Sequence, residues 1–282
     1  MAEPASSVVL TRRPIPISPS SKNPAPSRSV DIVSSLLTPA ECTDLITTHD
    51  HEADMHAISG TYTSRLRKII EDDDLAELLW SRLSRIYQGT EVVDEDGQVW
   101  SAMGLNPCFR LCKYRAGDGF STHVDGRRLA TVDTQSFMTV NIYLNTVPAE
   151  HGGATRFLLD LTTYPPGTSS SCDPQADNST SSVLSQNQPV EGSAAIFRDD
   201  IYHDGKVLRS GVKYLLRTDM MFQRARPFTF DEMYPPHKFA AKERALKALD
   251  LAQRLEDAGN RDEAVRWYKL AFRLDEDLER YS

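Results

Sequence analysis

Two strand-like segments, far apart in the chain, constrain the fold most. The first, Asn106–Asp125 (NPCFRLCKYRAGDGFSTHVD), ends in a His-x-Asp pair. Its alternating part leads through a glycine-containing turn at 116–119 into a short strand that carries the pair. The second, residues 189–217, indicates a turn, a buried apolar strand ending at Phe197, then His203 and a further strand. This pattern predicts a mainly β chain with His and Asp side chains held at strand ends.

The His-x-Asp pair alone is weak evidence for a metal site. With 7 His and 40 Asp+Glu in 282 residues, about one His-x-acid pair is expected by chance. Its combination with His203 is more informative, because two imidazoles and one carboxylate can hold Fe(II) on one face and leave the other face open. We therefore expect His123, Asp125 and His203 to be metal ligands. His151 and His237 are rivals for the third position, but neither precedes a strand with a basic residue at the matching distance.

Basic residues on the last strand indicate an anion site beside these ligands. Lys213, Leu215 and Arg217 alternate along the strand and therefore share one face. A cation inside an apolar interior needs an anionic partner, because an unpaired buried charge is costly. A dicarboxylate cosubstrate would provide one. Taken singly, Lys213 is more often a solvated strand lysine, and Tyr114 and Tyr143 are more often packing residues.

From about Ser29 to Gln223 the chain resembles the prolyl 4-hydroxylase-type Fe(II)/2-oxoglutarate dioxygenases. The matching elements, in order, are the segment 33–42, Gly104-Leu-Asn-Pro107, Tyr114 with Gly117, His123-Val-Asp125, the strand 138–145, Gly152-Gly-Ala-Thr155 with Phe157, Gly192 with Phe197, and His203 with Lys213. The resemblance implies a mainly β fold with flanking helices (α+β), built on a double-stranded β-helix, or jelly roll.

The resemblance also implies roles for individual residues. His123, Asp125 and His203 would be the catalytic iron ligands, and Lys213 would bind the C5 carboxylate of 2-oxoglutarate. Tyr114 matches a family tyrosine whose hydroxyl helps to hold 2-oxoglutarate, and Tyr143 is a weaker candidate for the same role. Arg217 competes with Lys213, because a guanidinium can bind a carboxylate through two hydrogen bonds.

The implied reaction consumes O2 and 2-oxoglutarate, hydroxylates a substrate and releases succinate and CO2, with L-ascorbate as the reductant. The carboxylate ligand Asp125 favours hydroxylation over halogenation. A prolyl residue of an intracellular protein is the first expected substrate, and a small molecule is the second. Two other classes remain open: a non-catalytic jelly-roll scaffold, and a cupin dioxygenase that needs no 2-oxoglutarate.

Composition and charge bear on partners and compartment. The net charge of −8 and the pI near 5.4 argue against broad nucleic-acid or membrane binding. The chain has no apolar segment of signal-peptide or membrane-spanning length, so a cytoplasmic or nuclear protein is expected. The cysteines, Cys42, Cys108, Cys112 and Cys172, lack CxxC spacing and are expected to be free thiols in a reducing compartment.

The chain divides into a tail, one domain and a helical appendage. Residues 1–28, rich in Pro and Ser, are predicted to be disordered, and residues 29–226 to form the dioxygenase domain, with a flexible insertion loop at 160–188. Residues 64–87 have helical spacing of apolar residues and predict one helix. Residues 237–282 resemble one tetratricopeptide-like hairpin, and a single repeat is expected to pack on the barrel, dimerise or bind a partner.

Overall fold

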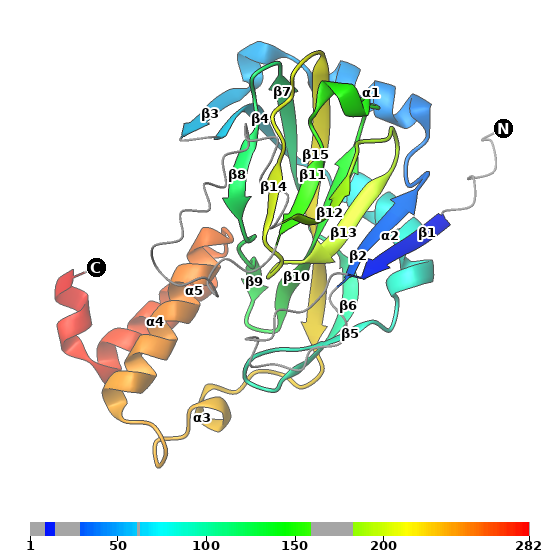
Figure 1. Ribbon diagram of the computed structural model, residues 1–282. Helices are drawn as coiled ribbons and strands as arrows, with labels where there is room; N and C mark the ends of the chain where they lie inside the picture. The colour runs from blue at the N-terminus through cyan, green and yellow to red at the C-terminus, as the bar shows by residue number, and fades with distance from the viewer. Residues whose placement is uncertain (1–8, 15–28, 61–62, 159–182, 282) are drawn as a thin grey trace. The chain divides into compact units, whose positions relative to one another are not determined.

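The computed structural model describes residues 9–14, 29–60, 63–158 and 183–281, whose strands form a large and a small antiparallel sheet (Figure 1). The large sheet has the order β1 (Val9–Pro14), β2 (Ser29–Ser34), β13 (Ala194–Arg198), β10 (Thr134–Tyr143), β15 (Val212–Arg224), β7 (Cys108–Arg115), β4 (Thr63–Glu71) and β3 (His56–Gly60). Off this path, β5 (Glu91–Val93), β6 (Val99–Leu105) and β9 (Leu129–Thr131) join it. The small sheet has the order β12 (Val183–Asn187), β11 (Thr155–Leu158), β14 (His203–Gly205) and β8 (Phe120–His123). This is the mainly β, jelly-roll fold with helices that the sequence predicted.

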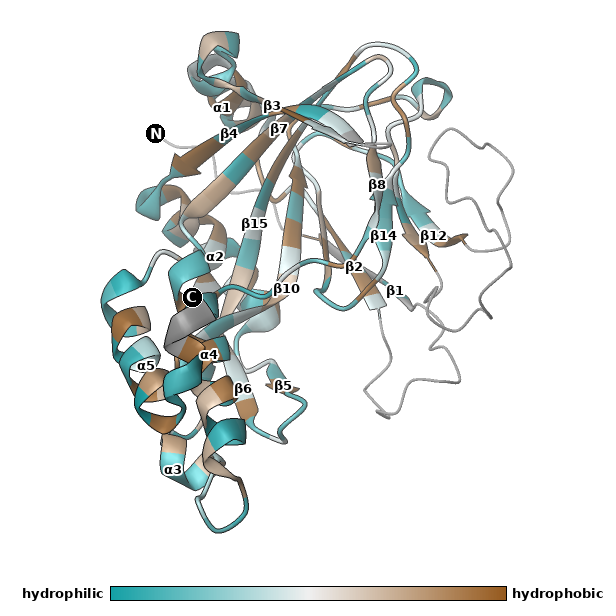
Figure 2. Ribbon diagram, turned by 90° about the vertical axis from the view of Figure 1, so that its left-hand side faces the viewer, coloured by the Kyte–Doolittle hydropathy of each residue, from teal (hydrophilic) through white to brown (hydrophobic). Residues whose placement is uncertain are grey.

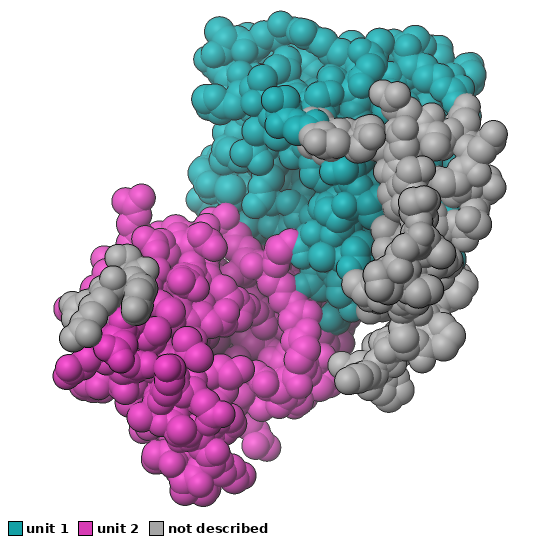
Figure 3. All heavy atoms as spheres, turned by 60° about the vertical axis from the view of Figure 1, so that its left-hand side comes forward, with its two compact units in different colours: residues 1–86, 105–125, 138–219 teal, residues 87–104, 126–137, 220–282 magenta. Residues whose placement is uncertain are grey.

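The chain forms two compact units, coloured separately in Figure 3. Unit 1 comprises residues 1–86, 105–125 and 138–219, and unit 2 comprises residues 87–104, 126–137 and 220–282. All four strands of the small sheet belong to unit 1, whereas β10 and β15 contribute residues to both units. The predicted site residues all lie in unit 1.

The core of unit 1 is formed by apolar side chains from strands of both sheets. Its buried members are Val30, Ile32, Cys112, Tyr114, Tyr143, Val147, Phe157, Ala195, Phe197, Ile201, Leu208 and Leu215. Phe157 of the small sheet packs edge-on against Phe197 of the large sheet, with ring centroids 5.1 Å apart. Burying one such side chain contributes about 1.5–3 kcal/mol, so this core fixes the strands that carry the site.

Two helices of unit 1 are joined by a charged contact. Helix α1 (Pro39–His49) begins with a capping box, in which Glu41 N donates to Thr38 Oγ1 and Thr38 N donates to Glu41 Oε2. Arg82, on helix α2 (Asp73–Tyr87), donates to both carboxylate oxygens of Glu41, at 2.9 and 2.6 Å. The start of α1 is thereby tied to the middle of α2.

Three sequence predictions differ from the structure. Residues 64–87 are not one helix, because β4 occupies Thr63–Glu71 and pairs with β7 before α2 begins at Asp73. Part of the predicted disordered tail is a strand, since Val9–Pro14 forms β1 and pairs with β2. The end of the predicted 160–188 loop is β12, Val183–Asn187, which pairs with β11; residues 160–182 lie outside the described residues.

Unit 2 contains helices α3 (Phe230–Met233), α4 (Ala241–Asp257) and α5 (Arg261–Leu274), followed by the 3-10 helix η4 (Glu276–Tyr281). In Figure 2 both α4 and α5 carry brown residues as well as teal ones, as amphipathic helices do. Their apolar side chains, including Ala248, Leu251 and Leu255, share a core with Leu129 of β9 and with Phe230. The hairpin therefore packs on sheet residues of its own unit, one of the three expected outcomes.

Polar contacts fix the same packing of the hairpin. Arg128 Nη2 donates to Ala258 O at 2.8 Å, and Asn260 Nδ2 donates to Ala130 O at 2.8 Å. Arg254 Nη2 donates to Gln135 Oε1 at 2.7 Å. The turn between α4 and α5 is thus bonded to the β9 segment at several points. The likeness to a tetratricopeptide repeat stays a prediction.

Short 3-10 helices complete the described elements of unit 1: η1 (Glu52–Asp54) and η2 (Ala149–His151). No helix in the described residues is both long enough and apolar enough to cross a membrane. Within the described part of the chain, Cys42, Cys108 and Cys112 form no disulfide, as expected, and Cys172 lies outside it.

Candidate metal centre

The pairing of two strands of the small sheet brings the predicted histidines together. Strand β8 pairs with β14 so that His123 lies directly opposite His203, and their ring centroids are 4.2 Å apart. Asp125 follows β8 by two residues and lies between the two imidazoles. His123 Nε2 is 3.5 Å from Asp125 Oδ1, and His203 Nε2 is 3.5 Å from Asp125 Oδ2. The three potential ligand atoms lie within 4.8 Å of one another, which suits one metal ion.

Backbone carbonyls orient both imidazoles. His123 Nδ1 lies 2.9 Å from Ser121 O, and His203 Nδ1 lies 3.0 Å from Ile201 O. A carbonyl oxygen only accepts, so each Nδ1 carries a proton, which leaves Nε2 as the ring nitrogen that can ligate a metal. Such a partner behind a ligating histidine fixes the ring and its tautomer.

Aromatic rings surround these imidazoles. Phe120 packs against His123 with centroids 4.2 Å apart, and Phe197 packs against His203 with centroids 4.7 Å apart. Burial lowers the pKa of His203 to about 4, and the nearby Asp125 only partly offsets that effect. His203 is therefore neutral, as a metal ligand must be, throughout the physiological range.

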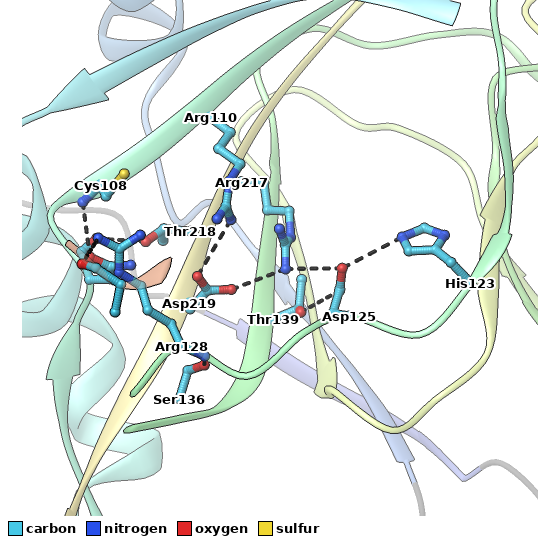
Figure 4. A network of polar contacts seen from close by, with 12 residues as sticks. Cys108, Arg110, His123, Asp125, Arg128, Ser136, Thr139, Arg217, Thr218 and Asp219 are labelled. Carbon is cyan, nitrogen blue, oxygen red and sulfur yellow. Dashed lines mark hydrogen bonds and ion pairs between the residues drawn. The ribbon is translucent and has the colours of Figure 1, made fainter. Parts of the chain in front are cut away.

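Asp125 is held by residues that the sequence did not assign to it (Figure 4). Thr139 Oγ1 donates to Asp125 Oδ2 at 2.5 Å, and Arg217 Nη2 lies 2.9 Å from Asp125 Oδ1. Burial by itself would raise the pKa of Asp125, but His123, Arg217, His203 and Thr139 together hold it well below its usual range. The carboxylate is thus ionised and fixed in orientation.

Arg217 also contacts a second carboxylate, that of Asp219. Its Nη2 also donates to Asp219 Oδ1 at 3.1 Å, and Asp219 Oδ2 lies 3.5 Å from Arg110 Nη1. Burial lowers the pKa of Arg217, yet Asp219 and Asp125 raise it above its ordinary value overall. Arg217 is therefore engaged by two carboxylates of the protein, which favours Lys213 over Arg217 as the partner of a cosubstrate carboxylate.

Lys213 lies in a different environment on the same face of β15. It is directly opposite Tyr114 of β7, and its Nζ lies 5.2 Å from the Tyr114 ring centroid and 5.7 Å from that of Tyr143. Its Nζ donates to Gly153 O at 2.7 Å, and within the described residues it forms no ion pair. Burial lowers the pKa of Lys213 to about 8, with Cys112 and Asp204 offsetting part of that effect. A buried ammonium of this kind calls for an anion.

Gly152 and Gly153 allow the loop before β11 to lie close to Val207, Leu208 and Lys213. Both have left-handed backbone, with φ of 72° and 74°. A Cβ on Gly152 would lie 2.3 Å from Val207 O, and one on Gly153 would lie 3.0 Å from Leu208 Cδ1 and 3.7 Å from Lys213 Cδ. These glycines keep Gly153 O within reach of the Lys213 ammonium.

Further polar groups gather around Tyr143, whose hydroxyl donates to Thr155 Oγ1 at 2.8 Å. Thr155 of β11 is directly opposite Asn187 of β12, and Asn187 Nδ2 is buried, lies near the Tyr143 hydroxyl and forms no well-aligned hydrogen bond. An unmatched buried donor usually has a ligand or a water as its partner. The unpaired Lys213 ammonium and the unpaired Asn187 amide fit a bound carboxylate, and the histidine–aspartate set fits Fe(II).

The structure thus brings together the predicted residues His123, Asp125, His203, Lys213, Tyr114, Tyr143 and Arg217. Among the described residues, the rivals His151 and His237 do not join the cluster of ligand atoms. Sequence reasoning missed Thr139, Thr155 and Asn187. Thr139 and Thr155 lie within motifs quoted from the sequence, but Asn187 was assigned to the 160–188 loop and gave no signal.

No protein-family model and no curated protein matches the chain. Solved structures similar to it include prolyl hydroxylases and other 2-oxoglutarate/Fe(II) oxygenases, the class that the sequence resembles. The viral collagen prolyl hydroxylase of Paramecium bursaria Chlorella virus-1, in its 2-oxoglutarate complex, is 15% identical with a TM-score of 0.43; the match covers 70% of this chain and 96% of that one. A prolyl-4-hydroxylase of Pseudomonas putida is 14% identical with a TM-score of 0.45, covering 71% and 94%. A prolyl hydroxylase of Trichoplax adhaerens, in complex with a hypoxia-inducible-factor peptide, is 15% identical with a TM-score of 0.45, covering 68% and 82%.

Proposed function

We propose that the protein is an Fe(II)- and 2-oxoglutarate-dependent dioxygenase that hydroxylates its substrate. The observation that supports this most is the pairing of two features in one unit. One is the histidine–aspartate–histidine cluster, and the other is a fully buried lysine with no ion-pair partner in the described residues. Catalysis by the metal alone does not require the buried Lys213 ammonium, whereas a dicarboxylate cosubstrate would supply the anion that this ammonium lacks.

In this proposal His123, Asp125 and His203 hold the iron through Nε2, a carboxylate oxygen and Nε2. When bound, Fe(II) and 2-oxoglutarate supply the oxidising chemistry, with O2 consumed and succinate and CO2 released. Ser121 O and Ile201 O keep the imidazoles in the ligating tautomer, while Thr139 and Arg217 keep the Asp125 carboxylate ionised.

The same proposal assigns the cosubstrate to the neighbouring residues. Lys213 binds the C5 carboxylate by charge, and Tyr114 and Tyr143 line the space around the ammonium. Asn187 contributes its unmatched Nδ2 donor to a polar group of the bound molecule. Burial of these side chains excludes water, which strengthens each of the polar contacts.

The finer parts of the proposal follow the family resemblance. The substrate is a prolyl residue of an intracellular protein, or failing that a small molecule, and L-ascorbate restores iron oxidised in unproductive turnovers. The protein works in the cytoplasm or nucleus and binds neither nucleic acid nor membrane. The C-terminal hairpin offers its outer face to a protein partner or to a second copy of the chain.

Calorimetric titration of 2-oxoglutarate into the Mn(II)-loaded protein tests the cosubstrate assignment without turnover. Lys213→Ala should weaken 2-oxoglutarate binding by at least tenfold and leave Mn(II) affinity unchanged. Lys68→Ala, on β4 and paired with Asp54 at 3.4 Å, is the matched control and should change neither. Wild-type affinity in Lys213→Ala would contradict the proposal.

A further inference from the structure

Strand β4 carries two arginines, and the sheet register determines which way they face. Strand β4 pairs with β7 so that Arg67 is opposite Cys112 and Leu66 is opposite Lys113, which places Arg65 opposite Tyr114. Residues directly opposite in an antiparallel pair share a face. Since Tyr114 is in turn opposite Lys213, Arg65 and Arg67 face the same side of the sheet as the Lys213 ammonium.

Arg65 also lies close to the candidate iron ligands. Its guanidinium carbon is 4.2 Å from the centroid of the Phe120 ring, and that ring packs at 4.2 Å against the His123 ring. One aromatic side chain therefore separates Arg65 from the metal centre. All of these residues belong to unit 1.

Neither arginine is neutralised by the described residues. Arg65 Nε and Nη1 are buried and have no hydrogen-bond partner, and the guanidinium stacks on the Phe120 ring. Arg67 forms no ion pair with any residue that the structure describes. Asp118, which contacts the neighbouring residue Ser64, already accepts from Ser64 Oγ and from Arg115 N. Buried guanidinium N–H groups without acceptors are costly unless a ligand supplies them.

The charges on the inner face of the sheet also leave the two arginines of β4 without a partner. The inner face of β4, β7 and β15 presents the cations Arg65, Arg67, Arg110, Lys213 and Arg217. Asp219 and the ligand Asp125 hold Arg110 and Arg217, and under the proposed function 2-oxoglutarate accounts for Lys213. Arg65 and Arg67 remain without a carboxylate partner among the described residues, and Arg65 is the one that lies a single aromatic ring from the metal centre.

We propose that Arg65 and Arg67 form a substrate subsite that binds a carboxylate, so that the substrate is acidic next to the carbon that reacts. This inference rests on the proposed function and adds a substrate class to it. A guanidinium binds a carboxylate through paired hydrogen bonds, and Arg65 is preorganised for this by the Phe120 ring beneath it. The carboxylate belongs to an Asp or Glu side chain of a peptide or to a small organic acid.

Binding of paired probes to the Mn(II)- and 2-oxoglutarate-loaded full chain tests the inference. The peptide probes are two fluorescent pools centred on Pro with Gly, Ala and Ser flanks, one carrying two Glu residues and the other two Gln residues. The small probes are N-acetylglutamate and N-acetylglutamine. Their binding is measured by displacement of a bound fluorescent pool or by calorimetry. The acidic member of at least one pair should bind at least tenfold more tightly, and which pair does so identifies the source of the carboxylate.

The variants separate this subsite from the cosubstrate site. Arg65→Gln/Arg67→Gln should reduce the acidic preference to within twofold and leave 2-oxoglutarate affinity unchanged. Lys68→Gln, on the same strand but the opposite face, should keep the preference. The inference is overturned if wild-type protein shows no acidic preference in either pair, if the preference survives the double substitution, or if that substitution abolishes 2-oxoglutarate binding. Failure of wild-type protein to bind 2-oxoglutarate at all would instead overturn the proposed function.

Discussion

The side chains of Arg217 and Lys213 project from the same face of β15, yet they make different contacts. Arg217 contacts Asp125 and Asp219, whereas Lys213 lies between two tyrosine rings with a single carbonyl acceptor. The same type of charge thus fixes the Asp125 carboxylate at one site and, under the proposed function, attracts an anion at the other. Sequence spacing alone could not separate the two roles, because both residues alternate on one strand.

Substitution of Arg217 tests its positioning role. Arg217→Gln should lower Fe(II) affinity by about 10–100-fold, because Asp125 loses the partner that holds its carboxylate. Metal titration under anaerobic conditions measures the change, and exposed Arg85→Gln is the control. Unchanged iron affinity together with lost 2-oxoglutarate affinity would show instead that Arg217 binds the cosubstrate.

The buried Lys213 should leave a signature in the pH dependence of stability. Its pKa in the folded protein is about 8, below the ordinary 10.5, so its charged form destabilises the fold at pH below 8. Between these two values the unfolded chain holds a proton that the folded chain lacks, so stability rises with pH. Urea unfolding of the ligand-free protein should therefore show Lys213→Met more stable than wild type at pH 7, with the difference shrinking towards pH 10. A difference that does not depend on pH would contradict the buried-ammonium description.

At the scale of elements, the contact between α1 and α2 should make the stability of the fold depend on pH under acid conditions. Arg82 and the Thr38 cap lower the pKa of Glu41 from 4.5 to about 2, although burial opposes this. The folded-state pKa is the lower one, so the stabilisation is present above pH 4.5 and is lost as the pH falls through 2. Wild type should exceed Glu41→Gln in unfolding free energy at pH 6, and the two should converge near pH 2. Equal stability at pH 6 would show that the contact contributes nothing.

The elements that the sequence predicted well have a strong local signal. Strands β7, β13 and β15 have alternating or apolar runs between turns. Strand β4 was predicted as a helix because Leu66, Ile69 and Ile70 have helical spacing, and pairing with β7 overrode that preference. Strand β12 gave no local signal, since its order comes from pairing with β11, and Asn187 was missed with it.

At the scale of the whole chain, the C-terminal hairpin is part of the core of unit 2. Leu255 is fully buried in α4, whereas Leu246 of the same helix is 49% exposed. Leu255→Ala should lower the unfolding free energy by about 2–5 kcal/mol, because it leaves a cavity among residues of α5 and β9. Leu246→Ala, the matched control, should change it by less than about 0.5 kcal/mol. Urea unfolding followed by the fluorescence of the three tryptophans measures both, and equal effects would contradict the packing.

Under the proposed function we claim that one cluster holds iron while a neighbouring lysine holds 2-oxoglutarate. Anaerobic titration of the metal-free protein with Fe(II) and then 2-oxoglutarate tests it directly, because the chelate has a visible charge-transfer absorption that needs no substrate. We expect the band to appear in wild type, to be absent in His123→Ala, Asp125→Ala and His203→Ala, and to need more 2-oxoglutarate in Lys213→Ala. Iron binding without the band would favour a cupin-type metal enzyme, and no iron binding would favour a non-catalytic scaffold; either result would contradict the claim.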